Sequence, residues 1–417
     1  MSRQTMLVMV DTIDNNNKFY ELTELSDGRV QARYGRIGTT EQKRVYPPGN
    51  FDKKLNEKLR KGYTRRDTSA VVPSNVTGIE AADRVNKALF NGHADAASRK
   101  FAEMLLRTNR HAIEDATGGK IMVNKDSGAV TTALGPVTQN QLSEARVLLA
   151  ELAGGSRNRR TIEKYLTIIP QRITNVRKTD WMTGSWVKSQ EDLLDALAAA
   201  LASTSTDDGT DAKDAPAIPF RNKLELVDAD SDEFAAVNKR FRDSLNSSHA
   251  SASRKLVRVW KITDTKRDEW DKSKASLKHA RTLWHGTTSG NVLSILRTGL
   301  ICPPSSDGRY ATTGRMFGDG VYFSDQSTKS LNYAVGVWNS NTGSGNPMMF
   351  LADVVMGREY RPTTYVNVAR ESRTGKDSKG RPYNSIFVRG GTSGVRNNEM
   401  IVWNTEQITL TYLCEFS

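Results

Sequence analysis

The spacing of apolar residues changes from strand-like to helix-like within the first 70 residues. The runs QTMLVMVD, KFYELTEL and RVQARYGRIG have the composition and alternation typical of strands. SDG at 26–28 separates two of these runs and predicts a hairpin turn. In FDKKLNEKLRKGY, by contrast, Phe51, Leu55 and Leu59 recur every four residues. That segment is predicted to be a helix with one buried face, which completes a small β-rich unit over residues 4–70.

Residues 80–203 have a mostly helical pattern. TQNQ at 138–141 matches a capping box and predicts the start of the helix LSEARVLLAEL, and the glycine pair at 154–155 predicts its end. SQED at 189–192 is predicted to start the helix LLDALAAALA in the same way. GKIMVNKDSGAV at 119–130 interrupts the helices and is predicted to form a hairpin.

Strand-like runs dominate after a low-complexity linker at 203–219. They are KLELVDA, RKLVRVWKI, RTLWHGT, GVYFSD, MMFLADVVMG and EMIVWNTEQITLTYLCEF. Two short helices are predicted among them: NVLSILRTGL, closed by Gly299, and STKSLNYAVG. The pattern predicts a multidomain α+β fold with a small β-rich domain at 4–70, an α-helical bundle at 80–203, and a mixed, mainly antiparallel β-sheet domain at 219–417. A length of 417 residues suits two to four domains.

The net charge adds an expectation about partners. The chain has 60 basic and 47 acidic residues, a formal net charge of +13, which favours a polyanionic partner such as nucleic acid. Residues 43–66 contain nine basic residues and only two acidic ones. This cluster is either a nucleic-acid contact or a solvated surface that keeps the protein soluble.

Composition also excludes several classes of protein. Two cysteines, Cys302 and Cys414, are too few for a disulfide framework or a cysteine-rich zinc site, and they suit a reducing compartment. No apolar run approaches the ~20 residues of a membrane span, and the N-terminal apolar stretch is too short for a secretory signal. We therefore expect an intracellular, soluble protein with no membrane partner.

Three strands each offer one polar side chain beside a glycine-rich or polar turn. Because successive side chains of a strand point to opposite faces, His285 lies opposite Trp284, and Tyr322 lies opposite both of its neighbours. Glu399 begins the strand EMIVW. Functional sites are often built at such strand ends. Each of these features taken alone is more simply explained by structure than by chemistry. A lone histidine such as His285 most often packs in a core, and a glycine-rich stretch such as TGRMFGDG most often forms a tight turn.

The helix after Tyr322 carries a further group of polar side chains. Lys329 and Tyr333 are four positions apart, and Ser330 and Tyr333 three, so all three share a face. They either bind a planar, partly polar ligand or form a solvated helix face. The sequence has no G-x-S-x-G nucleophile motif, no Walker-type phosphate loop, no HExxH motif and no paired-cysteine site. We expect no metal requirement.

Taken together, these segments resemble the catalytic domain of the poly(ADP-ribose) polymerases. LWHGT resembles that family's histidine-glycine-serine motif, MFGDGVYFSDQSTKSLNY its glycine-rich segment with a tyrosine, and NNEMIVWNTEQITLTYLCEF its C-terminal glutamate strand. LGPVTQNQLSEARVLLAEL, LTIIPQ and DLLDALAAAL resemble the family's helical regulatory domain. KFYEL, ARYGRIG and KGY resemble its WGR domain. The resemblance covers nearly the whole chain, in the domain order of the shorter DNA-dependent members.

The resemblance implies that NAD⁺ is the substrate and assigns roles to four side chains. His285 would bind the adenosine ribose, and Glu399 would be the catalytic carboxylate. Tyr322 and Tyr333 would sandwich the nicotinamide ring. A fixed carboxylate suits this reaction, because breaking the nicotinamide–ribose bond builds positive charge on the sugar.

Four neighbouring residues would complete the NAD⁺ site. Gly286 would pair its backbone with the nicotinamide carboxamide, and Ser330 would add a further bond to the same group. Thr287 stands where the family has a serine, and Lys329 would lie beside the reacting ribose.

The WGR resemblance implies a DNA contact but departs from the family at one position. Tyr34 replaces the motif's tryptophan, whereas Gly35 and Arg36 are retained. In the family the aromatic residue faces a terminal sugar or base and the arginine contacts a phosphate. Stacking on a base contributes roughly 1–3 kcal/mol in nucleic-acid binders. The basic residues expected to contact phosphates are Lys43, Arg44, Lys53 and Lys54.

These assignments together predict a DNA-dependent ADP-ribosyltransferase that is activated by strand breaks. It would release nicotinamide, transfer ADP-ribose to protein or nucleic-acid acceptors, itself included, and elongate the product to poly(ADP-ribose). Three alternatives stay open: a mono-ADP-ribosyltransferase, an NAD⁺ glycohydrolase for which DNA is irrelevant, and a catalytically silent scaffold that binds DNA ends. We expect a nuclear protein in a eukaryote, and otherwise a cytoplasmic or nucleoid-associated one.

Overall fold

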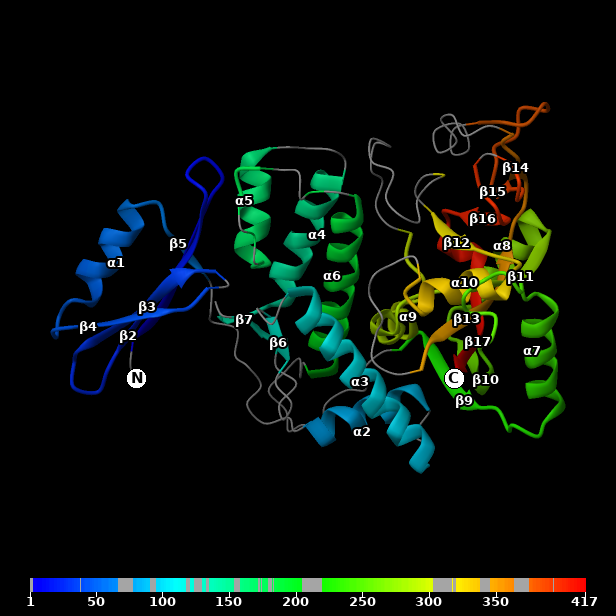
Figure 1. Cartoon of the computed structure of the whole chain (residues 1–417), viewed down its shortest axis with the longest axis horizontal. Coiled ribbons are helices and arrows are strands. Elements are labelled where there is room, and N and C mark those ends of the chain that lie inside the picture. The colour runs from blue at the N-terminus through cyan, green and yellow to red at the C-terminus, as the bar shows by residue number, and fades with distance from the viewer. Residues whose placement is uncertain are drawn as a thin grey trace. The chain divides into compact units, whose positions relative to one another are not determined.

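The computed structural model of the chain divides into two compact units (Figure 1). Residues 1–81 and 112–215 form the first unit, and residues 82–111 and 216–417 form the second. None of the helices in the described part of the chain combines the length and apolarity needed to cross a membrane. The described residues are 3–37, 39–66, 78–90, 95–117, 121–123, 130–132, 135–153, 158–171, 173, 175–178, 182, 184–204, 220–302, 317, 320–337, 346–363, 375–392 and 394–417.

The N-terminal part of the first unit is a five-stranded antiparallel sheet covered by one helix. Its order is β4-β3-β2-β1-β5, and the predicted hairpin at 26–28 is confirmed by the bond from Leu25 N to Arg29 O at 2.8 Å. The predicted helix is confirmed as α1 (Phe51–Arg60), with Phe51 and Leu55 buried. β4 was not predicted, because this edge strand exposes most of its side chains and shows no alternation. The strands are β1 (Gln4–Asp11), β2 (Asn16–Glu24), β3 (Val30–Arg36), β4 (Gln42–Tyr46) and β5 (Thr64–Arg66).

The predicted capping box at 138–141 is confirmed. The Oγ1 of Thr138 accepts from Gln141 N at 3.1 Å, and the Oε1 of Gln141 accepts from Thr138 N at 3.0 Å. The helix end predicted at 154–155 lies outside the described residues. The helices of this region are α2 (Gly78–Leu89), α3 (Ala96–Thr117), α4 (Gln139–Ala153), α5 (Arg159–Ile168) and α6 (Gly184–Thr204).

The helix start predicted at 189–192 is wrong. Helix α6 already begins at Gly184, and the Oγ of Ser189 donates to the carbonyl of Trp186 at 2.7 Å inside the helix. A serine in a helix interior bonds back to the preceding turn, so SQED resembles a start without being one. The hairpin predicted at 119–130 is confirmed by the antiparallel pairing of β6 (Ile121–Val123) with β7 (Val130–Thr132), which β8 (Gly135–Pro136) extends.

The C-terminal part of the second unit contains two sheets. The larger has the order β11-β13-β17-β10-β9 and the smaller the order β12-β16-β15-β14; every pair is antiparallel except β14 with β15. The multidomain α+β fold is therefore confirmed. The strands are β9 (Asn222–Leu226), β10 (Leu256–Asp264), β11 (Ala280–Gly286), β12 (Val321–Phe323), β13 (Met348–Val355), β14 (Glu359–Tyr360), β15 (Ser385–Val388), β16 (Glu399–Val402) and β17 (Ile408–Phe416).

Four helices accompany these sheets, and two of them were not predicted. The predicted pair is α9 (Val292–Thr298), followed by Gly299 at φ +83°, and α10 (Ser327–Ala334). The additional pair is α7 (Asp232–Asp243) and α8 (Arg267–Leu277), which are highly charged and bury few side chains. The C-terminal run predicted as strand is two strands in different sheets, because a turn at Thr405–Gln407 separates β16 from β17.

The first part of the helical region packs on the larger sheet of the second unit. The rings of Phe90 and Phe101 lie 5.4 and 4.5 Å from the Trp260 ring, centroid to centroid. Helix α3 begins in the second unit and ends in the first, because the division falls between residues 111 and 112. The domain limits 4–70, 80–203 and 219–417 stay predictions.

Candidate active site

Strand β11 carries His285 and Gly286 at its C-terminal end. It pairs with β13 from Ala280, opposite Val355, to Gly286, opposite Met349. The backbone of Trp284 also exchanges two hydrogen bonds with Ser324, at 2.8 and 3.0 Å. This bridge brings the end of β12 beside β11, so two segments nearly forty residues apart in sequence become neighbours.

The His285 ring is fixed by the strand next to it. Its Nδ1 lies 2.9 Å from the carbonyl oxygen of Tyr322, and its ring centroid lies 5.6 Å from that of Phe323. Because a carbonyl can only accept, Nδ1 must carry the hydrogen. His285 is therefore oriented by the backbone of Tyr322, and it is only half-buried.

Gly286 lies directly against helix α10. A Cβ atom at this position would be 1.7 Å from the carbonyl oxygen of Ser330, which no side chain can tolerate without moving the backbone. The Oγ of Ser330 donates to the carbonyl of Trp284 at 3.0 Å. Thr287 is almost buried, and its Oγ1 accepts from Asn291 Nδ2 at 3.5 Å. The helix thus rests on the last residues of β11, where only glycine fits.

Lys329 and Glu399 form an ion pair that is largely excluded from water. The Nζ of Lys329 lies 2.5 Å from the Oε2 of Glu399, and their side chains are 5% and 14% exposed. Burial raises the pKa of Glu399, and Lys329 opposes that shift. Burial lowers the pKa of Lys329, and Glu399 opposes that shift. Ionisable groups whose pKa values are shifted by burial and a specific charge partner are concentrated at functional sites.

One tyrosine, Tyr322, contacts His285, and another, Tyr333, lies near Glu399. The hydroxyl of Tyr322 accepts from the N–H of Phe317 at 3.0 Å, and its carbonyl accepts from His285. Burial, with a smaller contribution from the charge of Glu399, raises the pKa of Tyr333 to about 12. The tyrosine is therefore neutral at physiological pH.

Known proteins resemble the chain in two separate regions. Residues 231–417 match the family model described as the poly(ADP-ribose) polymerase catalytic domain, and residues 3–70 match the WGR domain. Over residues 231–417 the chain belongs to the poly(ADP-ribose) polymerase family. It is an ADP-ribosyltransferase, and the enzymes of this family use NAD⁺ as substrate.

Similarity to individual relatives is low but extends over much of the chain. The human protein mono-ADP-ribosyltransferase PARP3 is 25% identical over 84% of this chain and 71% of its own length. Poly [ADP-ribose] polymerase 2 of Arabidopsis thaliana is 25% identical over 96% of this chain and 71% of its own length. Poly [ADP-ribose] polymerase of Drosophila melanogaster is 26% identical over 67% of this chain, which spans only 31% of that relative.

Several residues of this candidate site were not anticipated from the sequence. The Nδ1 of His249 lies 2.9 Å from the Oγ1 of Thr328 on α10, and its Nε2 lies 3.4 Å from the Nδ2 of Asn397. Burial and, less strongly, the charge of Lys329 lower the pKa of His249. Asp325 and Asn398 also lie beside the pair formed by Lys329 and Glu399. No role of their own was assigned to these residues from the sequence, and the folded chain brings them together at the site.

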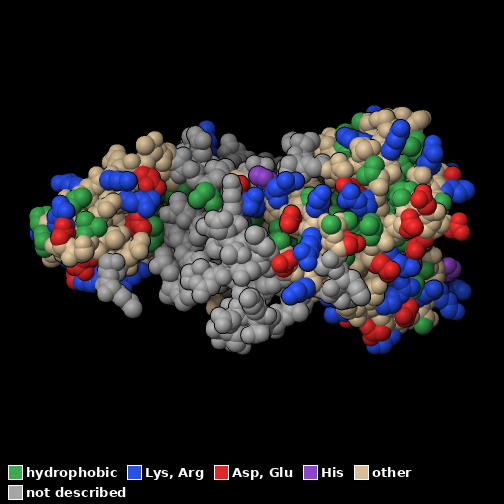
Figure 2. All heavy atoms as spheres, turned by 90° about the horizontal axis from the view of Figure 1, so that it is seen from below, with side chains coloured by type: hydrophobic (Ala, Val, Ile, Leu, Met, Phe, Trp, Pro, Cys, Tyr) green, Lys and Arg blue, Asp and Glu red, His purple; other side chains and the backbone are tan. Residues whose placement is uncertain are grey.

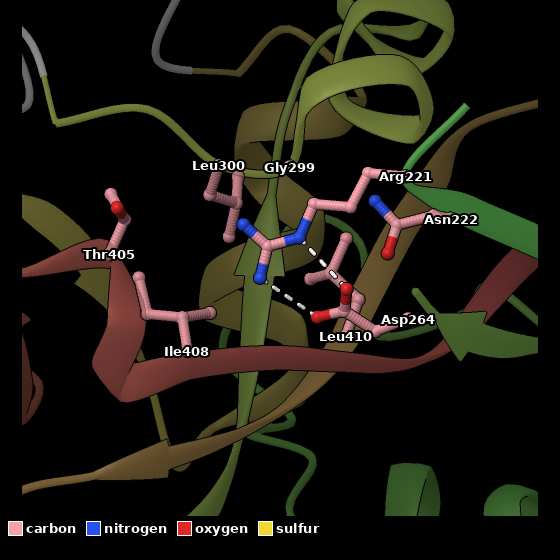
Figure 3. Close-up of a pocket in the computed structure, with 8 residues that line it drawn as sticks. All are labelled: Arg221, Asn222, Asp264, Gly299, Leu300, Thr405, Ile408 and Leu410. Carbon is pink, nitrogen blue, oxygen red and sulfur yellow. Dashed lines mark hydrogen bonds and ion pairs between the residues drawn. The ribbon is translucent and has the colours of Figure 1, made fainter. Parts of the chain in front are cut away.

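A hollow at the start of β9 is lined by none of the residues assigned to NAD⁺ (Figure 3). Within it, Arg221 donates two hydrogen bonds to Asp264, at 2.8 and 2.9 Å. The one charge of the guanidinium is thereby already balanced, and we assign no ligand to this hollow. It is lined by Arg221, Asn222, Asp264, Gly299, Leu300, Thr405, Ile408 and Leu410.

The structure brings part of the predicted DNA-binding set together at one tyrosine. The Arg44 guanidinium lies 5.1 Å and the Lys54 ammonium 4.8 Å from the ring centroid of Tyr46. Lys54 also pairs with Glu57 at 2.8 Å. Tyr46 was not anticipated from the sequence. A tyrosine between two cations matches the way aromatic and basic groups alternate in nucleic-acid surfaces.

The other residues predicted to contact DNA do not gather around Tyr46. The ring of Tyr34 stacks on that of Tyr20, with centroids 5.3 Å apart and planes at 24°. Lys43 and Lys53 are exposed. The guanidinium of Arg36 donates to the carbonyls of Asn15 at 2.6 Å and Ile173 at 3.1 Å. On the face shown in Figure 2, basic and acidic side chains are interspersed, so net charge alone does not mark an interface there.

Among the residues that the structure describes, no three His, Cys, Asp or Glu side chains lie close enough to form a metal site.

Proposed function

We propose that this polymerase-family enzyme transfers ADP-ribose from NAD⁺ to acceptors at the site formed by His285, Tyr322 and Glu399, and that DNA strand breaks activate it. The observation that supports this most directly is the largely buried ion pair between Lys329 and Glu399. Lys329 lies on α10, the helix whose backbone contacts Gly286, and Glu399 begins β16.

NAD⁺ would be oriented by groups from three elements. The backbone of Gly286 and the hydroxyl of Ser330 would bind the carboxamide of nicotinamide. The rings of Tyr322 and Tyr333 would enclose the nicotinamide, and aromatic pairs of this kind contribute about 0.5–1.5 kcal/mol beyond buried area. His285 would bind the adenosine ribose, with its ring held by the carbonyl of Tyr322.

The chemical step would cleave the bond between the ribose C1′ and the nicotinamide nitrogen. The bonding electrons leave with nicotinamide, which becomes neutral, and the ribose becomes an oxocarbenium-like cation. Glu399 stabilises that cation more than the ground state, which is the requirement for catalysis. The oxygen of the acceptor hydroxyl then forms the new bond to C1′, and its proton passes to a base.

The acceptors would be proteins, the enzyme itself included, or nucleic acid, and we propose elongation to poly(ADP-ribose). Glu399 supports elongation, because a carboxylate at this position can also orient an acceptor hydroxyl. We place the protein in the nucleus if the source is a eukaryote, and otherwise in the cytoplasm or with the nucleoid. We propose that the reaction needs no metal.

DNA ends would bind the WGR domain through Tyr34 and the cations on β4 and α1. Four hydrogen bonds within the first unit support a relay from this domain to the helical region. Glu163 Oε1 accepts from both the N and the Oγ1 of Thr12, at 2.8 Å each. Asn17 Nδ2 donates to the carbonyl of Gln171 at 3.0 Å, and Arg36 donates to that of Ile173. Helix α3, which belongs to both units, would carry the signal onward.

The experiment that tests the function measures nicotinamide release from NAD⁺ with and without nicked DNA. We expect release that depends on DNA. Absence of release under both conditions would contradict the proposal and favour a silent DNA-binding scaffold. Equal release under both conditions would favour a DNA-independent transferase or glycohydrolase, and gel analysis of the product separates single transfer from polymer.

Removal of residues 1–79 tests the relay. We expect the truncated enzyme to lose DNA stimulation and to keep a basal rate. Full stimulation by DNA of the enzyme without residues 1–79 would refute the relay. The assignment of the catalytic residues would not be affected.

A further inference from the structure

A second carboxylate, Asp325, lies close to the Lys329–Glu399 pair. It belongs to the short segment between β12 and α10. The backbone of Ser324 pairs with that of Trp284, and the Oγ of Ser324 accepts from Gln326 N at 3.0 Å. Asp325 is therefore held in place at the start of the helix that carries Lys329.

One oxygen of Asp325 is connected to the catalytic pair through Asn398. Its Oδ2 accepts from the Nδ2 of Asn398 at 2.7 Å. The Oδ1 of Asn398 accepts from Gly390 N at 2.8 Å, and its main-chain oxygen accepts from Lys329 Nζ at 2.9 Å. Asn398 directly precedes Glu399 in the chain. Three hydrogen bonds thus fix the start of β16, and with it Glu399, relative to α10.

The other oxygen of Asp325, Oδ1, is buried and has no hydrogen-bond partner in the described part of the structure. A buried carboxylate oxygen without a donor lowers the stability of the folded protein, because the hydrogen bonds that it made with water are not replaced. An unpartnered buried polar group in a native structure calls for an explanation, and a catalytic role is one of the recognised explanations.

The balance of charges around the Lys329–Glu399 pair suggests a role for the Asp325 carboxylate. The titratable side chains near the pair come from α10, β11, β12–α10, β16 and the segment before β10. Tyr333 is neutral, with a pKa of about 12, and the lowered pKa of His249 disfavours its charged form. Among these residues of the described part of the chain, the ammonium of Lys329 therefore faces two carboxylates, Asp325 and Glu399. With Tyr322 of β12, these titratable side chains are His249, His285, Asp325, Lys329, Tyr333 and Glu399.

We propose that Asp325 is a positioning residue of the active site, which fixes Glu399 through Asn398 and supplies a second negative charge near the ribose as it becomes cationic. The proposal rests on the proposed function, because that function places the cationic ribose at Glu399. Lys329 balances one carboxylate, and Asp325 ensures that the site keeps a net negative charge when Glu399 is ionised.

The pH dependence of the rate follows from these charges. Activity needs ionised Glu399, so kcat falls as the pH drops through the pKa of this group. The negative charge of Asp325 raises that pKa, in addition to the larger effect of burial. In a plot of kcat against pH, the acidic limb is the fall of kcat at low pH. Removing the charge of Asp325 must therefore move this limb to lower pH, and adding a carboxylate must move it to higher pH.

The experiment compares Asp325→Asn and Asn398→Asp in the full chain, activated by nicked DNA, with kcat and KM of nicotinamide release measured across pH. Asp325→Asn keeps an oxygen that accepts from Asn398 and removes only the charge. We expect its kcat at neutral pH to fall about tenfold, with a smaller change in KM and the acidic limb at lower pH. Asn398→Asp places two carboxylates together, and its limb should move to higher pH.

A matched control is Asp353→Asn, which removes a carboxylate bonded to Thr282 at 2.7 Å on the neighbouring sheet. Its kcat should stay within about twofold of wild type, with the limb unmoved. The proposal is overturned if Asp325→Asn keeps the wild-type rate and limb, or if both variants move the limb in the same direction. Thermal unfolding checks folding, and Asn398→Asp remains the test if Asp325→Asn does not fold. Wild-type activity in Glu399→Gln would instead refute the proposed function.

Discussion

At the scale of single residues, the chemistry depends on a balance between burial and charge. Burial disfavours the charged forms of both Lys329 and Glu399, while each is the counter-ion of the other. Gly286 shows a different constraint, because the 1.7 Å approach of a Cβ to Ser330 excludes any side chain there. The site therefore combines a position that admits only glycine, Gly286, with an ion pair in which each partner stabilises the charged form of the other.

Glu399→Gln tests the catalytic carboxylate. The substitution keeps the shape of the side chain and removes its charge, so we expect kcat to fall by about 10²- to 10³-fold and polymer formation to be abolished. Some single transfer or NAD⁺ hydrolysis should remain. Glu406→Gln, an exposed residue seven positions further on, is the control and should behave as wild type. Unchanged polymer length in Glu399→Gln would show that the role is misassigned.

Lys329→Met tests the sign of the electrostatic coupling. Burial raises the pKa of Glu399 above its ordinary value of 4.5, and Lys329 lowers it. Without the ammonium, the pKa must rise further, so the acidic limb of kcat should move to higher pH. Measurement of kcat across pH tests this prediction. Movement of the acidic limb to lower pH would contradict the assignment of Lys329 and Glu399 as a pair.

At the scale of elements, helix ends and strand pairing determine where these residues lie. The bridge between Trp284 and Ser324 joins the end of β11 to β12, and α10 follows three residues after β12. Similar sequence signals nevertheless had different outcomes. TQNQ is a true capping box, whereas SQED lies inside α6, which already begins at Gly184.

Thr138→Ala and Ser189→Ala form a matched pair for this difference. Thr138 satisfies a backbone N–H at a helix end, so its removal should lower the free energy of unfolding by about 1 kcal/mol. Ser189 is exposed, bonds back to Trp186 and accepts a long hydrogen bond from Gln190 at 3.4 Å, so its removal should change that free energy by less than about 0.5 kcal/mol. Denaturant unfolding measures both, and equal losses would argue against the cap.

At the scale of the whole molecule, α3 belongs to both compact units, and the β1–β2 turn is bonded to the helical region. The proposed relay would depend on these connections. Glu163 is central among them, since one carboxylate oxygen accepts two hydrogen bonds from Thr12. The Nε of Arg159 donates to the Oγ1 of Thr12 as well, at 2.8 Å.

Glu163→Ala should uncouple DNA binding from activity. We expect the Kd for nicked DNA, measured by fluorescence anisotropy, to change by less than about twofold, while DNA-stimulated nicotinamide release falls several-fold. Glu144→Ala is the matched control, because Glu144 pairs with Lys164 between α4 and α5 without contacting the WGR domain. If both variants keep full stimulation, the contact at Thr12 is not part of the relay.

The sequence by itself determined the local structure and the chemistry-bearing residues. Turn residues, capping residues and apolar spacing act over a few positions, which is why the hairpin at 26–28, α1, α9 and the cap at Thr138 were predictable. His285, Tyr322 and Glu399 stood out because each is polar beside a turn at the end of a strand, and because their order resembles a known family.

Only the tertiary structure decided which residues meet. Asp325, Asn398 and His249 lie beside Glu399 because separate segments converge there, and no local pattern records such a contact. The C-terminal run was predicted as one strand, yet a turn sends β16 and β17 into different sheets. The physical reason is the same in each case: hydrogen bonding across strands and burial of charge depend on distant partners, which the neighbouring sequence does not specify.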